Sequence, residues 1–248
     1  MTAELLALCR TVYEADGRAG GSEDAVVRSG GAVRVLRFDY ASAGAVDRAM
    51  LASHVTRADL AAVERFALPE LRDRALLRRA FVRVALGSSL GIAPRFVPLE
   101  KGRRGKPELR GHDRLAVSLS HTDDVVLLAL ARGLLVGVDV ERMAANIQPD
   151  LLAPTVLHEE ETHLLTGLTG DAQKRAFLRV WCRKEAALKV TGIGLLDDLT
   201  SLSVVPEQVR LGACSDPRVT HEDARTVTLM DLALDDAHQS ALATTPLR

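Results

Sequence analysis

At 248 residues, with 47% hydrophobic side chains, the chain is long enough to bury a core as one large domain or two small ones. No run approaches the ~18 apolar residues that cross a membrane, and a net charge of −1 gives no bulk attraction for nucleic acid. Three cysteines, an odd and small number, suit free thiols in a reducing compartment. We therefore expect a cytoplasmic protein with no membrane or nucleic-acid partner.

Hydrophobic periodicity in the first half predicts a helix, a strand after a Gly- and Asp-rich break, and then a mainly helical region with an interruption near Pro69. The first helix is expected over residues 3–13 and the strand over 32–40, followed by segments over 45–54 and 58–90. A polar, glycine-rich stretch over residues 101–111 is expected to be a loop.

The second half begins with three strand-like runs, continues with a helical stretch that has breaks at Gly167 and Gly170, and ends in short strands and a polar tail. We expect Asp171 to cap the start of the last helix and Gly192 its end. The expected strands cover residues 115–120, 125–131, 134–140, 200–205, 209–211 and 226–232, and the helical stretch covers 149–191. Helices and strands in this order predict a mixed α+β or α/β fold.

Two segments carry most of the chemical information. In Gly137-Val138-Asp139-Val140-Glu141, the two carboxylates lie two residues apart in a strand-like run, so both point to the same face. Trp181, Glu185 and Lys189 are spaced four residues apart, which places them along one face of a helix. If the strand and the helix meet, three carboxylates and a lysine converge. That combination indicates a Mg²⁺ site beside a phosphate.

Four motifs together resemble the Sfp-type 4′-phosphopantetheinyl transferases. They are Lys106-Pro107, Ser118-Leu119-Ser120-His121, Gly137–Glu141 and Trp181–Lys189, and they have the order and spacing of that family. The resemblance covers roughly residues 56–205. It implies two similar α+β halves, residues 1–114 and 115–248, packed as a pseudo-dimer with coenzyme A in the cleft between them.

The resemblance also implies the catalytic set of Asp139, Glu185 and Lys189. Asp139, Glu141 and Glu185 would bind Mg²⁺ or Mn²⁺ together with pyrophosphate oxygens of coenzyme A. Lys189 would contact the attacked phosphate and protonate the leaving group. The base is either Glu185 or a metal-bound water, and the sequence does not separate the two.

Coenzyme A contacts are implied at Arg74, Lys106, Pro107, Ser120, His121, Lys184 and Lys189. Lys184 matches a lysine that pairs with an acid of the preceding helix, which in this chain would be Glu161. The chain departs from the family where Asp59 and Ala62 replace basic residues.

The implied reaction moves the 4′-phosphopantetheine group from coenzyme A to a serine of an acyl or peptidyl carrier protein and releases adenosine 3′,5′-bisphosphate. We expect a monomer. A separate hypothesis is that Arg175, Arg179 and Arg183 face the acidic helix of the carrier. Two alternatives stay open: a non-catalytic coenzyme A-binding protein, and a Mg²⁺-dependent nuclease, although the E-x-K signature of many nucleases is absent.

Overall fold

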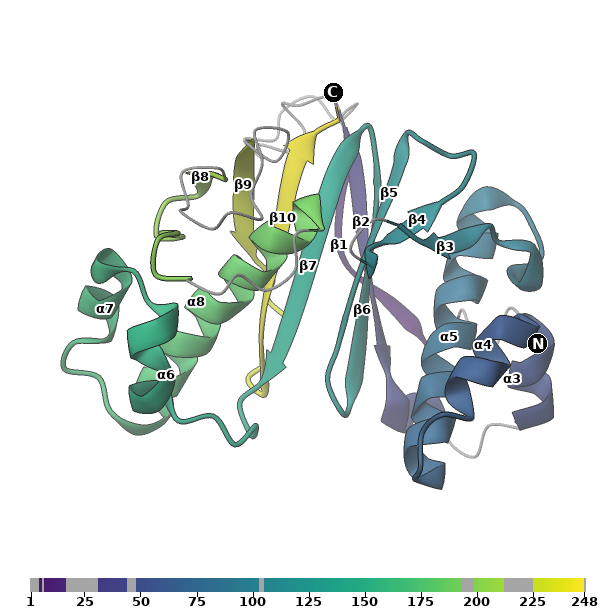
Figure 1. Ribbon diagram of the computed structural model, residues 1–248, viewed down its shortest axis with the longest axis horizontal. Coiled ribbons are helices and arrows are strands. Elements are labelled where there is room, and N and C mark those ends of the chain that lie inside the picture. The colour runs from purple at the N-terminus through teal and green to yellow at the C-terminus, as the bar shows by residue number, and fades with distance from the viewer. Residues whose placement is uncertain are drawn as a thin grey trace.

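In the computed structural model, the described residues are 5, 7–16, 31–43, 48–102, 105–192, 199–211 and 225–247. Among them, two four-stranded antiparallel sheets lie at the centre (Figure 1). The N-terminal sheet has the order β1 (Cys9–Asp16), β2 (Ala32–Asp39), β6 (Val125–Arg132), β5 (Leu115–His121). The C-terminal sheet has the order β7 (Leu134–Arg142), β10 (His238–Pro246), β9 (Thr226–Asp231), β8 (Gln208–Arg210). A hairpin of β3 (Leu99–Lys101) and β4 (Pro107–Leu109) completes the strands of the described residues.

Helices cover the outer face of each sheet, so the layers run helix, sheet, sheet, helix (Figure 1). The two longest helices of the described part, α5 and α8, have 22 residues each. On the N-terminal side are α3 (Arg48–His54), α4 (Arg57–Val63) and α5 (Pro69–Leu90), with the short helices η1 (Tyr40–Ala43) and η2 (Pro94–Phe96). On the C-terminal side are α6 (Pro149–Val156), α7 (Glu159–Leu165) and α8 (Gly170–Thr191). No helix within the described ranges is long and apolar enough to cross a membrane.

Three hydrophobic clusters hold these layers together. One lies between α5 and the N-terminal sheet, with Phe38 stacked on Phe81 at a ring distance of 5.1 Å. A second lies between α8 and the C-terminal sheet. The third joins the inner faces of the two sheets and includes Val35, Leu127 and Val138. Strand β7 is therefore covered on both faces, which explains why its sequence is almost continuously apolar.

Most of the predicted elements of the mixed α+β fold are confirmed. Helix α5 begins at Pro69, where a missing N–H costs nothing, and the helix α8 ends at Gly192 with φ 72°, a left-handed conformation that favours glycine. The prediction that Asp171 caps α8 was wrong, because α8 begins at Gly170 and Thr169 is the N-cap residue. Asp171 lies in the first turn of the helix.

Four predictions about local structure were wrong. Residues 9–13 form strand β1 instead of helix, because they pair with β2. The segment over 101–111 contains the last residue of strand β3 and the whole of strand β4, and residues 200–205 form no strand. The polar tail contains β10, which lies between β7 and β9 in the C-terminal sheet. The predicted break over 16–31 falls mainly on residues 17–30, outside the described residues.

Strands β5 and β6, which follow residue 115, belong to the N-terminal sheet, and Gly133 separates β6 from β7 of the other sheet. Strands β5 and β6 pair with each other, and β6 pairs with β2 of the N-terminal sheet. The chain then enters β7, the first strand of the other sheet.

Candidate active site

The site forms where β7 meets α8, and Gly137 sets how closely they approach. Side chains of β7 alternate, so Val136, Val138 and Val140 pack against the other sheet while Asp139 and Glu141 face the helix. A Cβ added at Gly137 would lie only 1.9 Å from the carbonyl oxygen of Ala186. The glycine therefore lets the helix backbone rest directly on the strand.

Asp139 is the centre of the resulting polar cluster. Its side chain is buried, and its Oδ1 accepts hydrogen bonds from Ser120 Oγ at 2.8 Å and from Lys189 Nζ at 2.6 Å. Lys189 also donates to Ser120 Oγ at 3.1 Å and to the carbonyl of Val138 at 3.2 Å. Trp181 Nε1 donates to Glu141 Oε1 at 3.2 Å. The predicted convergence of strand and helix is thus what the structure shows.

A cavity of about 340 Å³ opens over this cluster. Its walls combine three carboxylates with one lysine and with the end of β5. The lining residues are Leu119, Ser120, His121, Asp139, Glu141, Trp181, Glu185 and Lys189.

The carboxylates of this cavity are poorly neutralised by the protein. Burial, and next the negative charge of Asp139, raise the pKa of Glu185 to about 7. The same two causes raise the pKa of Glu141. Asp139 Oδ2 and Glu185 Oε1 are buried without a hydrogen-bond partner within the described structure. Buried acceptors of this kind are costly unless something compensates them, and a bound cation would do so.

The described residues do not by themselves form a closed metal cage. No group of three acidic, histidine or cysteine side chains among them converges tightly enough to hold an ion alone. Mg²⁺ commonly keeps several waters and takes one or two carboxylates plus substrate phosphates. The two unpartnered oxygens fit that mode of binding.

His121 lies where this cavity adjoins two others. It also lines a cavity of about 300 Å³ with Arg78 and Pro107, and one of about 280 Å³ with Arg74 and Arg78. Burial, followed by the positive charge of Arg78, lowers the pKa of His121. Arg74 forms an ion pair with Asp123 at 3.5 Å. Five of the predicted coenzyme A contacts therefore line adjoining cavities: Arg74, Pro107, Ser120, His121 and Lys189.

Serine hydroxyls join the two sheets beside this site. Ser118 Oγ accepts from the N–H of Val138 at 3.0 Å, and Ser120 Oγ accepts from the N–H of Val140 at 3.3 Å. The Ser-x-Ser alternation of β5 thus satisfies backbone donors of β7 and fixes Ser120 next to Asp139.

Lys106 lies elsewhere than the resemblance implies. Its Nζ donates to the carbonyls of Val136, Lys189 and Val190 at 3.0, 2.6 and 2.6 Å. Burial lowers its pKa to about 8. The ammonium thus binds the last turn of α8, where the helix has unpaired carbonyls and a partial negative charge.

Lys184 points into the C-terminal core and away from the cavity. Its Nζ lies 2.7 Å from Glu161 Oε2 and donates to the carbonyls of Leu199 and Leu202 at 2.8 and 2.6 Å. Glu161 also accepts from the N–H groups of His158 and Val204. The predicted Lys184–Glu161 pair is confirmed, and its complete burial indicates a structural role instead of a contact with coenzyme A.

The arginine stripe of α8 binds its own chain. Arg183 is buried and donates to Asp231 of β9 at 2.7 and 3.0 Å, and Arg179 donates to the same carboxylate at 2.7 Å. Arg175 donates to the carbonyl of Asp236 at 3.3 Å. Arg183 is therefore not free to contact a carrier protein, whereas Arg175 and Arg179 are exposed, and for these two the carrier hypothesis stays a prediction.

Sequence reasoning missed Arg78, which lines two of the cavities around His121. Its position four residues after Arg74 on α5 was the available signal, because residues with this spacing share a helix face. It also missed that Gly137 is required for the contact with α8.

Comparison with known proteins finds relatives of a single family. Residues 135–239 match the 4′-phosphopantetheinyl transferase superfamily. The 4′-phosphopantetheinyl transferase HetI of Nostoc sp. is 31% identical over 78% of this chain and 79% of its own. The 4′-phosphopantetheinyl transferase psf-1 of Bacillus pumilus is 28% identical over 74% and 76%, and gsp of Aneurinibacillus migulanus is 26% identical over 64% and 65%.

The fold and the site define an α+β enzyme with an acidic cluster and a lysine between two halves. The chain belongs to the 4′-phosphopantetheinyl transferase superfamily. The match to HetI, psf-1 and gsp confirms the resemblance to the Sfp type.

Proposed function

We propose that this protein transfers the 4′-phosphopantetheine group of coenzyme A to a serine hydroxyl of an acyl or peptidyl carrier protein. In this reaction the serine oxygen bonds to the β-phosphorus of coenzyme A. The bond from that phosphorus to the bridging oxygen breaks, and adenosine 3′,5′-bisphosphate leaves. The observation that carries the proposal is the cavity in which Asp139, Glu141, Glu185 and Lys189 meet.

We assign the divalent-cation ligands to Asp139, Glu141 and Glu185. The fit is supported by the unpartnered Asp139 Oδ2 and Glu185 Oε1 and by the oxygen-only donor set. Mg²⁺, when bound, would neutralise pyrophosphate charge and polarise the phosphorus. Mn²⁺ accepts the same oxygen ligands.

Lys189 is the group of this chain best placed to act on the phosphate. Its Nζ is held at 2.6 Å from Asp139, on the wall of the cavity, so its charge lies beside the place where a pyrophosphate would bind. It would stabilise the developing negative charge and donate a proton to the leaving oxygen. Glu185 would accept the serine proton, directly or through a water, because its carboxylate lines the cavity beside Lys189 and its Oε1 has no hydrogen-bond partner within the described structure.

Coenzyme A would extend from this cavity past His121 and Pro107. Arg74, Ser120 and His121 are the proposed phosphate contacts, and Arg78 joins them because it lines the two cavities next to His121. Lys184 is left out of the proposed contacts, since it is buried with Glu161. Lys106 would contribute only through its backbone, next to Pro107. Because β5 and α8 of one chain complete the site, we infer that the active form is a monomer.

The test is to incubate the protein with coenzyme A, Mg²⁺ and a panel of apo carrier domains and to measure intact carrier masses. We expect the gain of one phosphopantetheine group, lost with EDTA. Asp139→Asn and Lys189→Met should each lower kcat/KM by about 10²-fold or more. Glu14→Gln, which affects only an exposed pair with Arg34, is the control. Binding of coenzyme A without transfer to any carrier would favour the non-catalytic alternative.

A further inference from the structure

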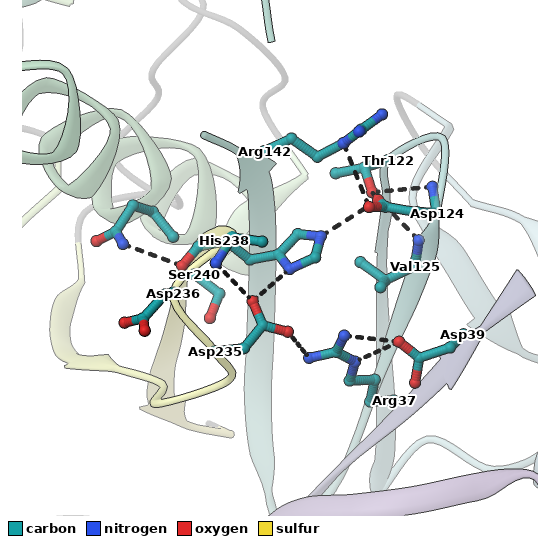
Figure 2. Close-up of polar contacts among 12 residues, drawn as sticks. Arg37, Asp39, Thr122, Asp124, Val125, Arg142, Asp235, Asp236, His238 and Ser240 are labelled. Carbon is teal, nitrogen blue, oxygen red and sulfur yellow. Dashed lines mark hydrogen bonds and ion pairs between the residues drawn. The ribbon is translucent and has the colours of Figure 1, made fainter. Parts of the chain in front are cut away.

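A second polar cluster has His238 of β10 at its centre (Figure 2). The His238 side chain is 3% exposed. Its Nδ1 lies 2.7 Å from Asp235 Oδ1, and its Nε2 lies 3.2 Å from Asp124 Oδ1. An ionised carboxylate only accepts hydrogen bonds, so the ring donates to both partners at once only when it carries both protons.

A series of charged side chains extends from both sides of His238 (Figure 2). Beyond Asp235, the guanidinium of Arg37 donates to Asp235 Oδ2 and to Asp39 Oδ1, each at 2.6 Å. Beyond Asp124, Arg142 Nε lies 3.3 Å from Asp124 Oδ2. With His238 protonated, negative and positive groups alternate along the whole series.

This series crosses between the two sheets. Arg37 belongs to β2 of the N-terminal sheet, while His238 and Arg142 belong to β10 and β7 of the C-terminal sheet. Asp124 lies in the turn between β5 and β6, and Asp235 lies between β9 and β10. Burial by itself would raise the pKa of Asp235, but the hydrogen bonds and charges of Arg37 and His238 outweigh it and bring that pKa down to about 2. The hydrogen bonds of Thr122 and His238 likewise lower the pKa of Asp124 against the effect of burial.

What the series holds in place is the β5–β6 turn. The N–H of Thr122 donates to the carbonyl of Val125 at 2.9 Å, and the N–H of Val125 donates to Thr122 Oγ1 at 3.2 Å. The N–H of Tyr40 donates to the carbonyl of Asp124 at 2.9 Å, which ties the turn to the end of β2. This turn directly follows His121, so its position sets where His121 lies relative to Asp139.

We propose that His238 is a positioning residue of the transferase. By joining Asp124 to Asp235, it fixes the β5–β6 turn, and with it His121, against the strand that carries Asp139 and Glu141. The proposal rests on the phosphate-binding role proposed above for His121. It predicts that loss of His238 weakens coenzyme A binding while the catalytic carboxylates and Lys189 stay in place.

The test compares the full-length wild type with His238→Gln and Asp124→Asn. Asp124 is 41% exposed, so its variant removes the negative charge from the same link without disturbing the core, although the amide oxygen of asparagine can still accept a hydrogen bond. Glu14→Gln, in an exposed pair within the N-terminal sheet, is the matched control. Hydrogen exchange is measured at the amides of Tyr40, Thr122 and Val125, together with KM for coenzyme A and kcat.

We expect both variants to exchange these amides about fivefold faster or more and to raise KM for coenzyme A about tenfold, with kcat within about twofold. The control should match wild type. Unchanged exchange in both variants would overturn the proposal. Faster exchange with unchanged KM would also overturn it, because the cluster would then be only structural.

A separate variant, His121→Ala, distinguishes failure of this proposal from failure of the proposed site. If His121→Ala raises KM for coenzyme A, the KM of the His238 variant decides the positioning role. If His121→Ala leaves KM unchanged, the phosphate role of His121 fails, and exchange at Thr122 and Val125 alone decides whether His238 positions the turn.

Discussion

Replacing Lys184 with methionine should lower the free energy of unfolding of this protein while leaving its transfer reaction intact. Lys184 and Glu161 are both fully buried, and Lys184 Nζ lies within 2.8 Å of Glu161 Oε2 and of two carbonyl oxygens. Methionine fills a similar volume but removes the charge. Glu161 would then be a buried carboxylate whose remaining partners are the N–H groups of His158 and Val204.

The expected loss of stability is large. Breaking a buried ion pair by removing one partner typically costs about 3–5 kcal/mol, because an uncompensated charge stays in the core. Adding Glu161→Gln to Lys184→Met should recover about 1 kcal/mol or more of that loss, because it removes the buried charge, although the single amide oxygen can accept from only one of the two N–H groups. The coupling energy of the two sites in a double-mutant cycle is therefore expected to be well above 1 kcal/mol.

The assay is urea unfolding followed by circular dichroism and by the fluorescence of Trp181, the single tryptophan of the chain. Steady-state kinetics of the folded variant, measured at low temperature, should give a KM for coenzyme A within about twofold of wild type. A stability loss below about 1 kcal/mol would refute the argument from burial. A stable variant whose KM rises tenfold would instead restore Lys184 as a coenzyme A ligand.

Three further predictions follow from particular contacts. Gly137→Ala should lower the free energy of unfolding by about 2 kcal/mol or more and also lower activity, because the added Cβ would lie 1.9 Å from the Ala186 oxygen. Thermal unfolding and the carrier-mass assay check this, and a variant as stable and active as wild type would contradict it. Gly192→Ala should cost about 1 kcal/mol through its φ of 72° alone, with activity retained, and an unchanged melting temperature would argue against that reasoning. The pKa of Asp235 is lowered from 3.8 to about 2, so its contribution to stability is complete above pH ~4 and is lost as the pH falls toward 2. Asp235→Asn should therefore make the free energy of unfolding depend less steeply on pH in this acidic range. Equal slopes for the variant and the wild type would refute this prediction.

Much of the candidate site could be predicted from sequence because its information is local. The period of a strand places Asp139 and Glu141 on one side, and the period of a helix aligns Trp181, Glu185 and Lys189. Once the apolar faces of these two elements pack together, their polar residues must meet. The Lys184–Glu161 pair was found through the family resemblance, and its burial follows from the same packing.

The errors occurred where long-range pairing overrides local pattern. Residues 9–13 have a helix-like sequence but pair with β2, and residues 238–246 have a polar sequence but occupy a central position between β7 and β9. Lys106 carries a charge that suits a phosphate, yet its side chain reaches the carbonyls at the end of α8. Most of these partners lie tens of residues away along the chain, so a short stretch of sequence does not contain them.

The sequence by itself determined the α+β class, the identity of the acidic cluster and the family, because each depends on residue type at short spacing. Only the tertiary structure decided which other charges are already paired within the chain. Arg183 turned out to bind Asp231, Lys106 to bind carbonyls at the end of α8 and His238 to bridge two aspartates, while Asp139 Oδ2 and Glu185 Oε1 have no hydrogen-bond partner within the described structure. The physical reason is that a charge is neutralised by whatever the fold brings within a few ångströms of it, and that distance is not a property of the sequence neighbourhood.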